Sequence, residues 1–132
     1  MKAKLLIVPV ILVLIITARG ADAPIRFTEA DNGRTNSVNA GSEIKIVLEG
    51  NPTTGYSWAV ASFSTNKLQQ IGAVEYSQSE QSGEKHRVGV GGKFMFRFKA
   101  VGSGQGHIKL IYRRLWETTA SDKVYSVIID IK

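Results

Sequence analysis

Apolar and polar residues alternate along most of the chain with a period of two, the spacing expected of β-strands that bury one face. The alternating runs lie at residues 42–49, 56–60, 93–99, 108–113 and 125–131, with weaker ones at residues 25–28 and 68–76. Val47 breaks the alternation in the first strong run. No stretch keeps an apolar period of 3.6 residues, so the pattern predicts about seven short strands and no helix.

Turn-forming residues separate the predicted strands, for example Asn32-Gly33 and the glycine-rich stretch 102–104. Short alternating strands joined by such turns are typical of two packed antiparallel sheets. The sequence therefore predicts an all-β fold, an immunoglobulin-like antiparallel β-sandwich of about seven strands without a disulfide. Trp58 lies in the middle of an early strand, and we expect it to fill the centre of the core.

Residues 1–20 have the pattern of a secretory signal peptide, which leaves residues 21–132 for a single domain. Lysines precede an apolar run at residues 5–16, which is shorter than the roughly 20 residues of a transmembrane helix. Small residues favour cleavage before Ala21, with cleavage after Ala23 or an uncleaved anchor as alternatives. We therefore expect a secreted or exported protein (extracellular, periplasmic or endosomal-lysosomal) with no stable membrane association after signal cleavage.

Charge and composition exclude several kinds of partner. The chain has 17 Lys and Arg residues and 11 Asp and Glu; without the three basic residues of the leader, 14 remain against 11, a net charge of about +3. These residues alternate with apolar ones and form no basic block, so nucleic acid is not expected as a partner. The absence of cysteine excludes a cysteine nucleophile and thiolate metal sites. We expect a monomer without cofactor or metal.

The two histidines do not suggest an enzyme. His86 lies among charged residues in a polar stretch, and His107 begins a predicted strand. Neither has a catalytic partner at a useful spacing, and no Gly-x-Ser-x-Gly motif occurs. Surface histidines without a catalytic role are the simpler interpretation.

The first distinctive loop is Asn51-Pro52-Thr53-Thr54-Gly55, between two predicted strands. Pro52 fixes its own φ and extends Asn51, while Gly55 permits a positive φ, so the loop should be stiff. A loop already held in its bound shape loses little entropy on docking, and the two threonines would present small side chains at its tip. An ordinary hairpin turn is the alternative.

The second loop, within residues 77–92, ends in Gly89-Val90-Gly91-Gly92. Three glycines leave the backbone unobstructed, so its amides could pair with a partner chain in the manner of a strand. The motif precedes a strand and not a helix, which disfavours phosphate binding. A flexible linker is the alternative for this polar stretch.

The third loop, at residues 113–123, contains Arg114, Leu115 and Trp116. Trp116 lies outside the alternating pattern that would point it into the core. An exposed tryptophan beside an arginine is typical of residues that dominate binding energy in protein interfaces. The alternative is a Trp116 that folds back to cap the sandwich.

The three loops together resemble the motifs of the chagasin family of cysteine-protease inhibitors, and the resemblance covers essentially the whole chain after the leader. Asn-Pro-Thr-Thr-Gly before an aromatic residue is complete at Asn51–Tyr56, and Gly-x-Gly-Gly stands at Gly89–Gly92. The family's Arg-Pro-Trp corresponds to Arg114-Leu115-Trp116 after Tyr112, with Leu115 in place of the usual proline. That change should loosen the third loop and weaken binding by up to about 1 kcal/mol.

The resemblance implies a reversible, tight-binding inhibitor of papain-like cysteine proteases of the papain or cathepsin L/B type. Three loops would form a wedge, with Asn51–Tyr56 in the active-site cleft and Thr53 and Thr54 over the catalytic cysteine. Gly89–Gly92 would hydrogen-bond along the substrate groove, while Trp116 would pack on the opposite wall and Arg114 would make polar contacts beside it. An adhesion or structural module on the same fold is the alternative, because the fold alone proves no function.

Overall fold

The computed structural model describes residues 23–78, 91–114, 116 and 123–132, and the predicted leader at residues 1–20 lies outside this part of the chain. The described residues form nine strands and two short 3-10 turns. In chain order they are β1 (Ile25–Phe27), η1 (Glu29–Asp31), β2 (Thr35–Val38), β3 (Glu43–Gly50), η2 (Pro52–Thr54), β4 (Tyr56–Phe63), β5 (Leu68–Gln70), β6 (Glu75–Gln78), β7 (Gly92–Ala100), β8 (Gly104–Arg114) and β9 (Lys123–Ile131). No helix among the described residues could span a membrane.

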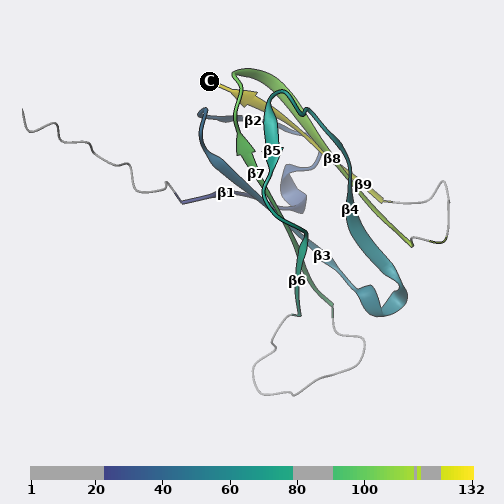
Figure 1. The fold of residues 1–132 in the computed structure, drawn as a ribbon. Helices are drawn as coiled ribbons and strands as arrows, with labels where there is room; N and C mark the ends of the chain where they lie inside the picture. The colour runs from purple at the N-terminus through teal and green to yellow at the C-terminus, as the bar shows by residue number, and fades with distance from the viewer. Residues whose placement is uncertain (1–22, 79–90, 115, 117–122) are drawn as a thin grey trace, which may run out of the picture.

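The strands form two sheets packed face to face, which confirms the all-β sandwich (Figure 1). One sheet has the order β1-β3-β7-β5, with β6 also paired to β7, and the other has the order β2-β9-β8-β4. The central pairs β3–β7, β4–β8 and β8–β9 are antiparallel. The short strand β1 pairs in parallel with β3, because the chain crosses to the opposite sheet and forms β2 between these two strands. In that sheet, β2 pairs in parallel with β9.

The strand count is nine and not about seven, for two local reasons. The strand β2 has a single buried apolar residue, Val38, so it lacks the alternation by which strands are recognised. The predicted strand at 68–76 is broken between β5 and β6, where Gly72 has φ of +68°. Both fragments nevertheless pair with β7, β6 with its first half and β5 with its second.

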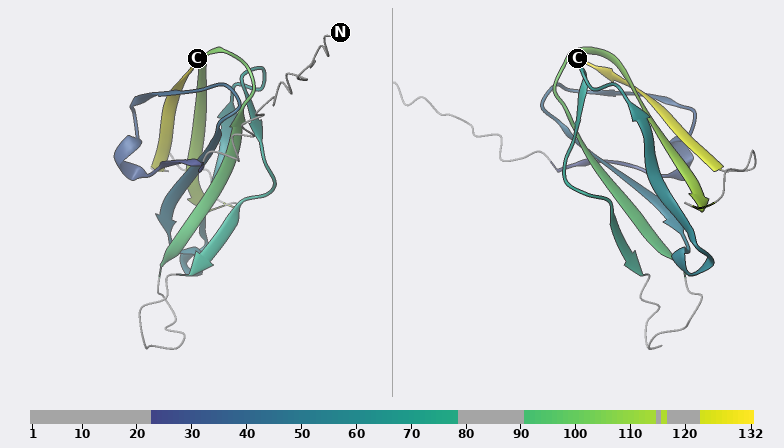
Figure 2. Two further views of the ribbon diagram at one scale, coloured as in Figure 1. Left: turned by 90° about the vertical axis from the view of Figure 1, so that its left-hand side faces the viewer. Right: turned by 45° about the vertical axis from the view of Figure 1, so that its right-hand side comes forward.

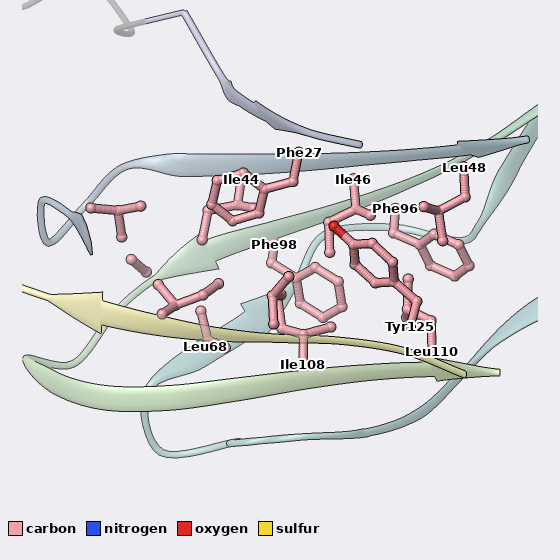
Figure 3. Packing of buried hydrophobic residues seen from close by; sticks show 14 of the residues in the cluster. Phe27, Ile44, Ile46, Leu48, Leu68, Phe96, Phe98, Ile108, Leu110 and Tyr125 are labelled. Atoms are coloured by element: carbon pink, nitrogen blue, oxygen red, sulfur yellow. The ribbon is translucent and has the colours of Figure 1, made fainter. Parts of the chain in front are cut away.

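The core lies between the two sheets and is built from the inward residues of the alternating strands (Figure 3). Phe96 and Phe98 of β7 face Ile108 and Leu110 of β8, and all four side chains are fully buried. Val47, the exception to the alternation, is also buried although it lies on the outer side of β3, beside Met95. Removing these side chains from water supplies the main stabilisation of a chain that has no disulfide.

Tyr125 carries a polar group into the core. Its ring is buried between the sheets, and its hydroxyl donates a hydrogen bond of 2.9 Å to the carbonyl oxygen of Thr28, at the start of η1 (Figure 3). Burial, together with the nearby charges of Asp31 and Glu29, raises the pKa of Tyr125 well above its usual value. The neutral, hydrogen-bonded phenol ties the crossover between β1 and β2 to the core.

Trp58 is buried in the sandwich, as the sequence predicts, and 7% of its surface is exposed. Its indole Nε1–H donates a hydrogen bond of 3.0 Å to the carbonyl oxygen of Glu49. Since Glu49 belongs to β3 and Trp58 to β4, this bond joins the two sheets one residue before β3 ends. Trp58 thereby fixes the base of the loop that connects these strands.

Candidate functional site

The strand ends that flank the three distinctive loops lie toward one end of the sandwich, the lower end in Figure 1. The connection from β3 to β4, the paired ends of β6 and β7, and the end of β8 all reach this end (Figure 2). Strand register explains the arrangement, because Gly50 at the end of β3 pairs with Gly92, and Tyr56 at the start of β4 pairs with Arg114. We refer to residues 51–55, Gly91, Gly92, Arg114 and Trp116 as the loop end.

Residues 51–55 form a compact turn held by its own hydrogen bonds. The side-chain oxygen of Asn51 caps η2 by accepting the Thr53 N–H at 3.1 Å, and Pro52 follows at the first position of the turn, where proline is favoured. The Gly55 N–H donates to the Pro52 carbonyl at 2.9 Å. Gly55 has φ of +84°, which confirms the predicted need for glycine at this position.

The two threonines are exposed at the tip of this turn and bonded within it. The Thr53 hydroxyl lies 2.6 Å from Asn51 Oδ1, and the Thr54 hydroxyl donates to the Asn51 carbonyl at 2.7 Å. Each branched side chain is thus held in a single orientation. The turn therefore exposes small side chains in fixed orientations, as the sequence predicts for a stiff loop.

The turn is also bonded to strand β8 on both sides. At its start, the Asn51 N–H donates to the Tyr112 hydroxyl oxygen at 3.0 Å. At its end, the Thr54 carbonyl accepts from the Arg114 Nε–H at 3.0 Å. The sequence motif does not identify Tyr112 as a site residue, although Tyr112-x-Arg114 has the two-residue spacing that places both side chains on one face of a strand.

Four side chains from β4 and β8 form a continuous stack beneath the turn, which we call the aromatic stack. Trp58 and Tyr112 have ring centroids 5.0 Å apart, and Tyr112 and Tyr56 have centroids 5.3 Å apart. The Arg114 guanidinium lies 4.6 Å above the Tyr56 ring, a cation–π geometry. The stack runs from the buried Trp58 to the exposed turn.

Trp116 lies beside the turn and is 70% exposed, so it does not fold back to cap the sandwich. Its ring lies against Gly55, where an added Cβ would come 2.9 Å from Trp116 Cζ2. Gly55 is therefore required both for its backbone conformation and for the approach of Trp116. Leu115, between Arg114 and Trp116, lies outside the described residues.

The second loop is described only at its last two glycines, because Gly89 and Val90 lie outside the described residues. Gly92 is the first residue of β7, and an added Cβ there would collide with the Ser77 carbonyl and come 2.6 Å from the Tyr76 ring. Internal packing thus accounts for glycine at position 92. An added Cβ at Gly91 would meet the Gly50 carbonyl at 3.4 Å, an ordinary contact.

In the part of the chain that the structure describes, no group of three or more His, Asp or Glu residues could hold a metal ion. His107 contacts Ser64, with Nδ1 and the hydroxyl oxygen 2.9 Å apart, on an exposed part of β8 away from the loop end. His86 lies outside the described residues.

The family model of the chagasin family peptidase inhibitors matches residues 37–129 of this chain. The chain therefore belongs to the chagasin family, and it is an inhibitor of cysteine proteases and not an enzyme.

Two curated relatives are similar over most of their length. Amoebiasin-1 of Entamoeba histolytica is 33% identical over 105 residues, which covers 80% of this chain and 97% of amoebiasin-1. Chagasin of Trypanosoma cruzi is 27% identical over 97 residues, covering 74% of this chain and 87% of chagasin.

Solved structures agree with this fold. The solution structure of amebosin has a TM-score of 0.69 at 33% identity and covers 84% of this chain and all of its own. The cysteine protease inhibitor EhICP2 of Entamoeba histolytica also has a TM-score of 0.69, at 25% identity, covering 82% of this chain and 95% of its own. PbICP-C, solved in complex with falcipain-2, shares the fold with a TM-score of 0.60 at 16% identity, covering 82% of this chain and 99% of its own.

Replacing Gly92 by alanine should destabilise the protein by about 1–3 kcal/mol, because the new methyl group has to displace the Ser77 backbone and the Tyr76 ring. Urea unfolding followed by tryptophan fluorescence measures the change. Gly91→Ala is the matched control, with an expected change within about 0.5 kcal/mol. Equal stabilities of the two variants would show that Gly92 is not required by packing.

Proposed function

We propose that this protein, as a monomer, is a reversible, tight-binding inhibitor of papain-like cysteine proteases of the papain or cathepsin L/B type. The turn at residues 51–55 enters the active-site cleft, with Gly89–Gly92 on one side and the third loop on the other. The observation that carries the proposal is the stiff, exposed threonine turn beside a 70% exposed Trp116. The complex of PbICP-C with falcipain-2 supports a protease partner for this fold.

The hydrogen bonds of the turn favour occlusion over cleavage. A cysteine protease attacks a carbonyl carbon and needs the carbonyl oxygen to accept hydrogen bonds from the enzyme. In this turn the Asn51 and Pro52 carbonyls accept bonds within the turn, and the Thr54 carbonyl accepts one from Arg114. Since these oxygens are engaged inside the inhibitor, we infer that the turn excludes substrate without forming an acyl-enzyme.

Trp116 supplies the apolar anchor of the proposed interface. Large aromatic side chains at the centre of an interface contribute most of its binding energy when a partner covers them. Trp116 is also held on one side by Gly55, so it loses less side-chain freedom on binding than an isolated residue. The turn and Trp116 would therefore dock together as one preformed surface.

The proposed inhibition is tested by titrating a protein of residues 21–132 against papain and a cathepsin L-type protease, with a fluorogenic peptide as substrate. We expect stoichiometric inhibition at nanomolar concentrations, as for a preorganised interface of roughly 800 Å² per partner. Activity should return on dilution, and the recovered inhibitor should keep its mass. No inhibition at micromolar concentrations of several papain-like enzymes would contradict the proposal and favour the adhesion module.

The variant Trp116→Ala should weaken protease binding by about 2 kcal/mol or more, because it removes the proposed anchor from the interface. The exposure of Trp116 predicts little change in the melting temperature. Inhibition constants and thermal melts of the two proteins provide the comparison. A large loss of stability with unchanged inhibition would mean that Trp116 serves the fold and not the interface.

We also propose that residues 1–20 are a signal peptide and that the inhibitor acts after export, in an extracellular, periplasmic or endosomal-lysosomal compartment. The lysines followed by the apolar run at residues 5–16 support this proposal. The intact mass of protein purified from the producing cells and their medium should correspond to a chain that begins at Ala21. A full-length mass in the mature protein would contradict cleavage.

A further inference from the structure

If the turn at residues 51–55 inhibits a protease as proposed, it has to be held in place before the protease arrives, so its effect on affinity rests on the proposed function. We propose that Arg114 is a positioning residue. It acts inside the inhibitor, with Tyr56, Tyr112 and Trp58, to lock the turn onto strand β8. The family motif suggests instead an arginine that contacts the protease.

The bonds within the turn fix its shape but not its orientation. Asn51 and Pro52 accept the hydrogen bonds that close the turn, and these bonds join residues 51–55 to one another. A turn held only by its own bonds could pivot as a unit about its two flanking residues. The contacts that join the turn to β8 therefore contribute to its orientation.

The aromatic stack supplies these contacts from an anchored base. Trp58 is buried, and its Nε1–H bond to the Glu49 carbonyl holds it against β3. Tyr112 is its cross-strand partner in register and packs on it at 5.0 Å. Because the Tyr112 hydroxyl accepts the Asn51 N–H at 3.0 Å, the anchored base fixes the start of the turn.

Arg114 completes the stack at the other end of the turn. It is the cross-strand partner of Tyr56, and its guanidinium lies 4.6 Å over the Tyr56 ring while Nε–H donates to the Thr54 carbonyl at 3.0 Å. Only a planar guanidinium can stack through its face and donate from its edge at the same time. Lysine, with the same charge, lacks both the plane and the Nε–H group, so this geometry distinguishes the two residues.

Two bonds on opposite sides of the turn prevent it from pivoting about its flanking residues. An inhibitor loop that is already oriented loses less conformational freedom when it docks. Residues that orient the turn should thus affect both its order in the unbound inhibitor and the affinity for the protease. A residue that acts only by contacting the protease should affect the affinity alone.

The test compares Arg114→Lys and Tyr112→Phe with the unmodified inhibitor. Each variant removes one of the described hydrogen bonds between the turn and β8, and Tyr112→Phe keeps the stacked ring. NMR measures amide hydrogen exchange of Thr53, Thr54 and Gly55, whose N–H groups are bonded within the turn, in the absence of protease. A papain titration then gives the inhibition constant and the association rate.

We expect exchange at these three amides to accelerate about tenfold in each variant, while the amides of β9 are unchanged. The inhibition constant should rise by about tenfold in each variant. In the double variant, the inhibition constant should rise by less than the product of the two single-variant increases, because both bonds restrain the same turn. The control is Arg97→Lys, the same change at an arginine paired with Glu43 on the other sheet, which should alter neither quantity.

Weaker inhibition by Arg114→Lys with unchanged exchange at the turn would overturn the proposal and assign Arg114 to the protease contact. Unchanged exchange and unchanged inhibition in both variants would also overturn it. The exchange measurement needs no protease. If the unmodified protein does not inhibit, the proposed function fails, while the positioning of the turn by Arg114 is still decided by exchange.

Discussion

The antiparallel register between β4 and β8 is the constraint on which the loop end depends. It places Trp58 opposite Tyr112 and Tyr56 opposite Arg114, so that four side chains stack in sequence from the core to the surface. Strand side chains alternate between the two faces of a sheet. A register shift of one residue between β4 and β8 would therefore place the two members of each pair on opposite faces. The register is itself secured by burial of the inward residues along the rest of β8.

Residues at the loop end have two different roles. Some hold the turn at residues 51–55 in place, and others are exposed on its surface. Tyr112 and Arg114 bond the backbone of the turn at its two sides, while Thr53 and Thr54 face outward with their hydroxyls engaged within it. Rigid presentation lowers the entropy lost on docking, which is how a small loop achieves high affinity. The absence of disulfides makes the connection to the core important, since no covalent link limits the movement of the turn.

Local sequence predicts those features of the site that depend on one or a few neighbouring residues. The positive φ of Gly55, the stiff turn after Asn51 and the exposure of Trp116 all follow from the residue type and its departure from the strand pattern. The β-sandwich follows from the period of two, because burial on one face of each strand requires a second sheet. The count of nine strands does not follow from this period, because β2 has no apolar alternation and the strand predicted at 68–76 is broken at Gly72.

The alternation of apolar residues, the turn residues and the loop motifs were thus enough to predict the fold class, the positions of the three loops and the resemblance to the chagasin family. They did not predict that Arg114 reaches Thr54, 60 positions away in the chain, or that Gly92 packs against Tyr76. Periodicity specifies the face on which a side chain lies, whereas its partner depends on which strands pair and in what register. Those pairings are set by packing of the whole core.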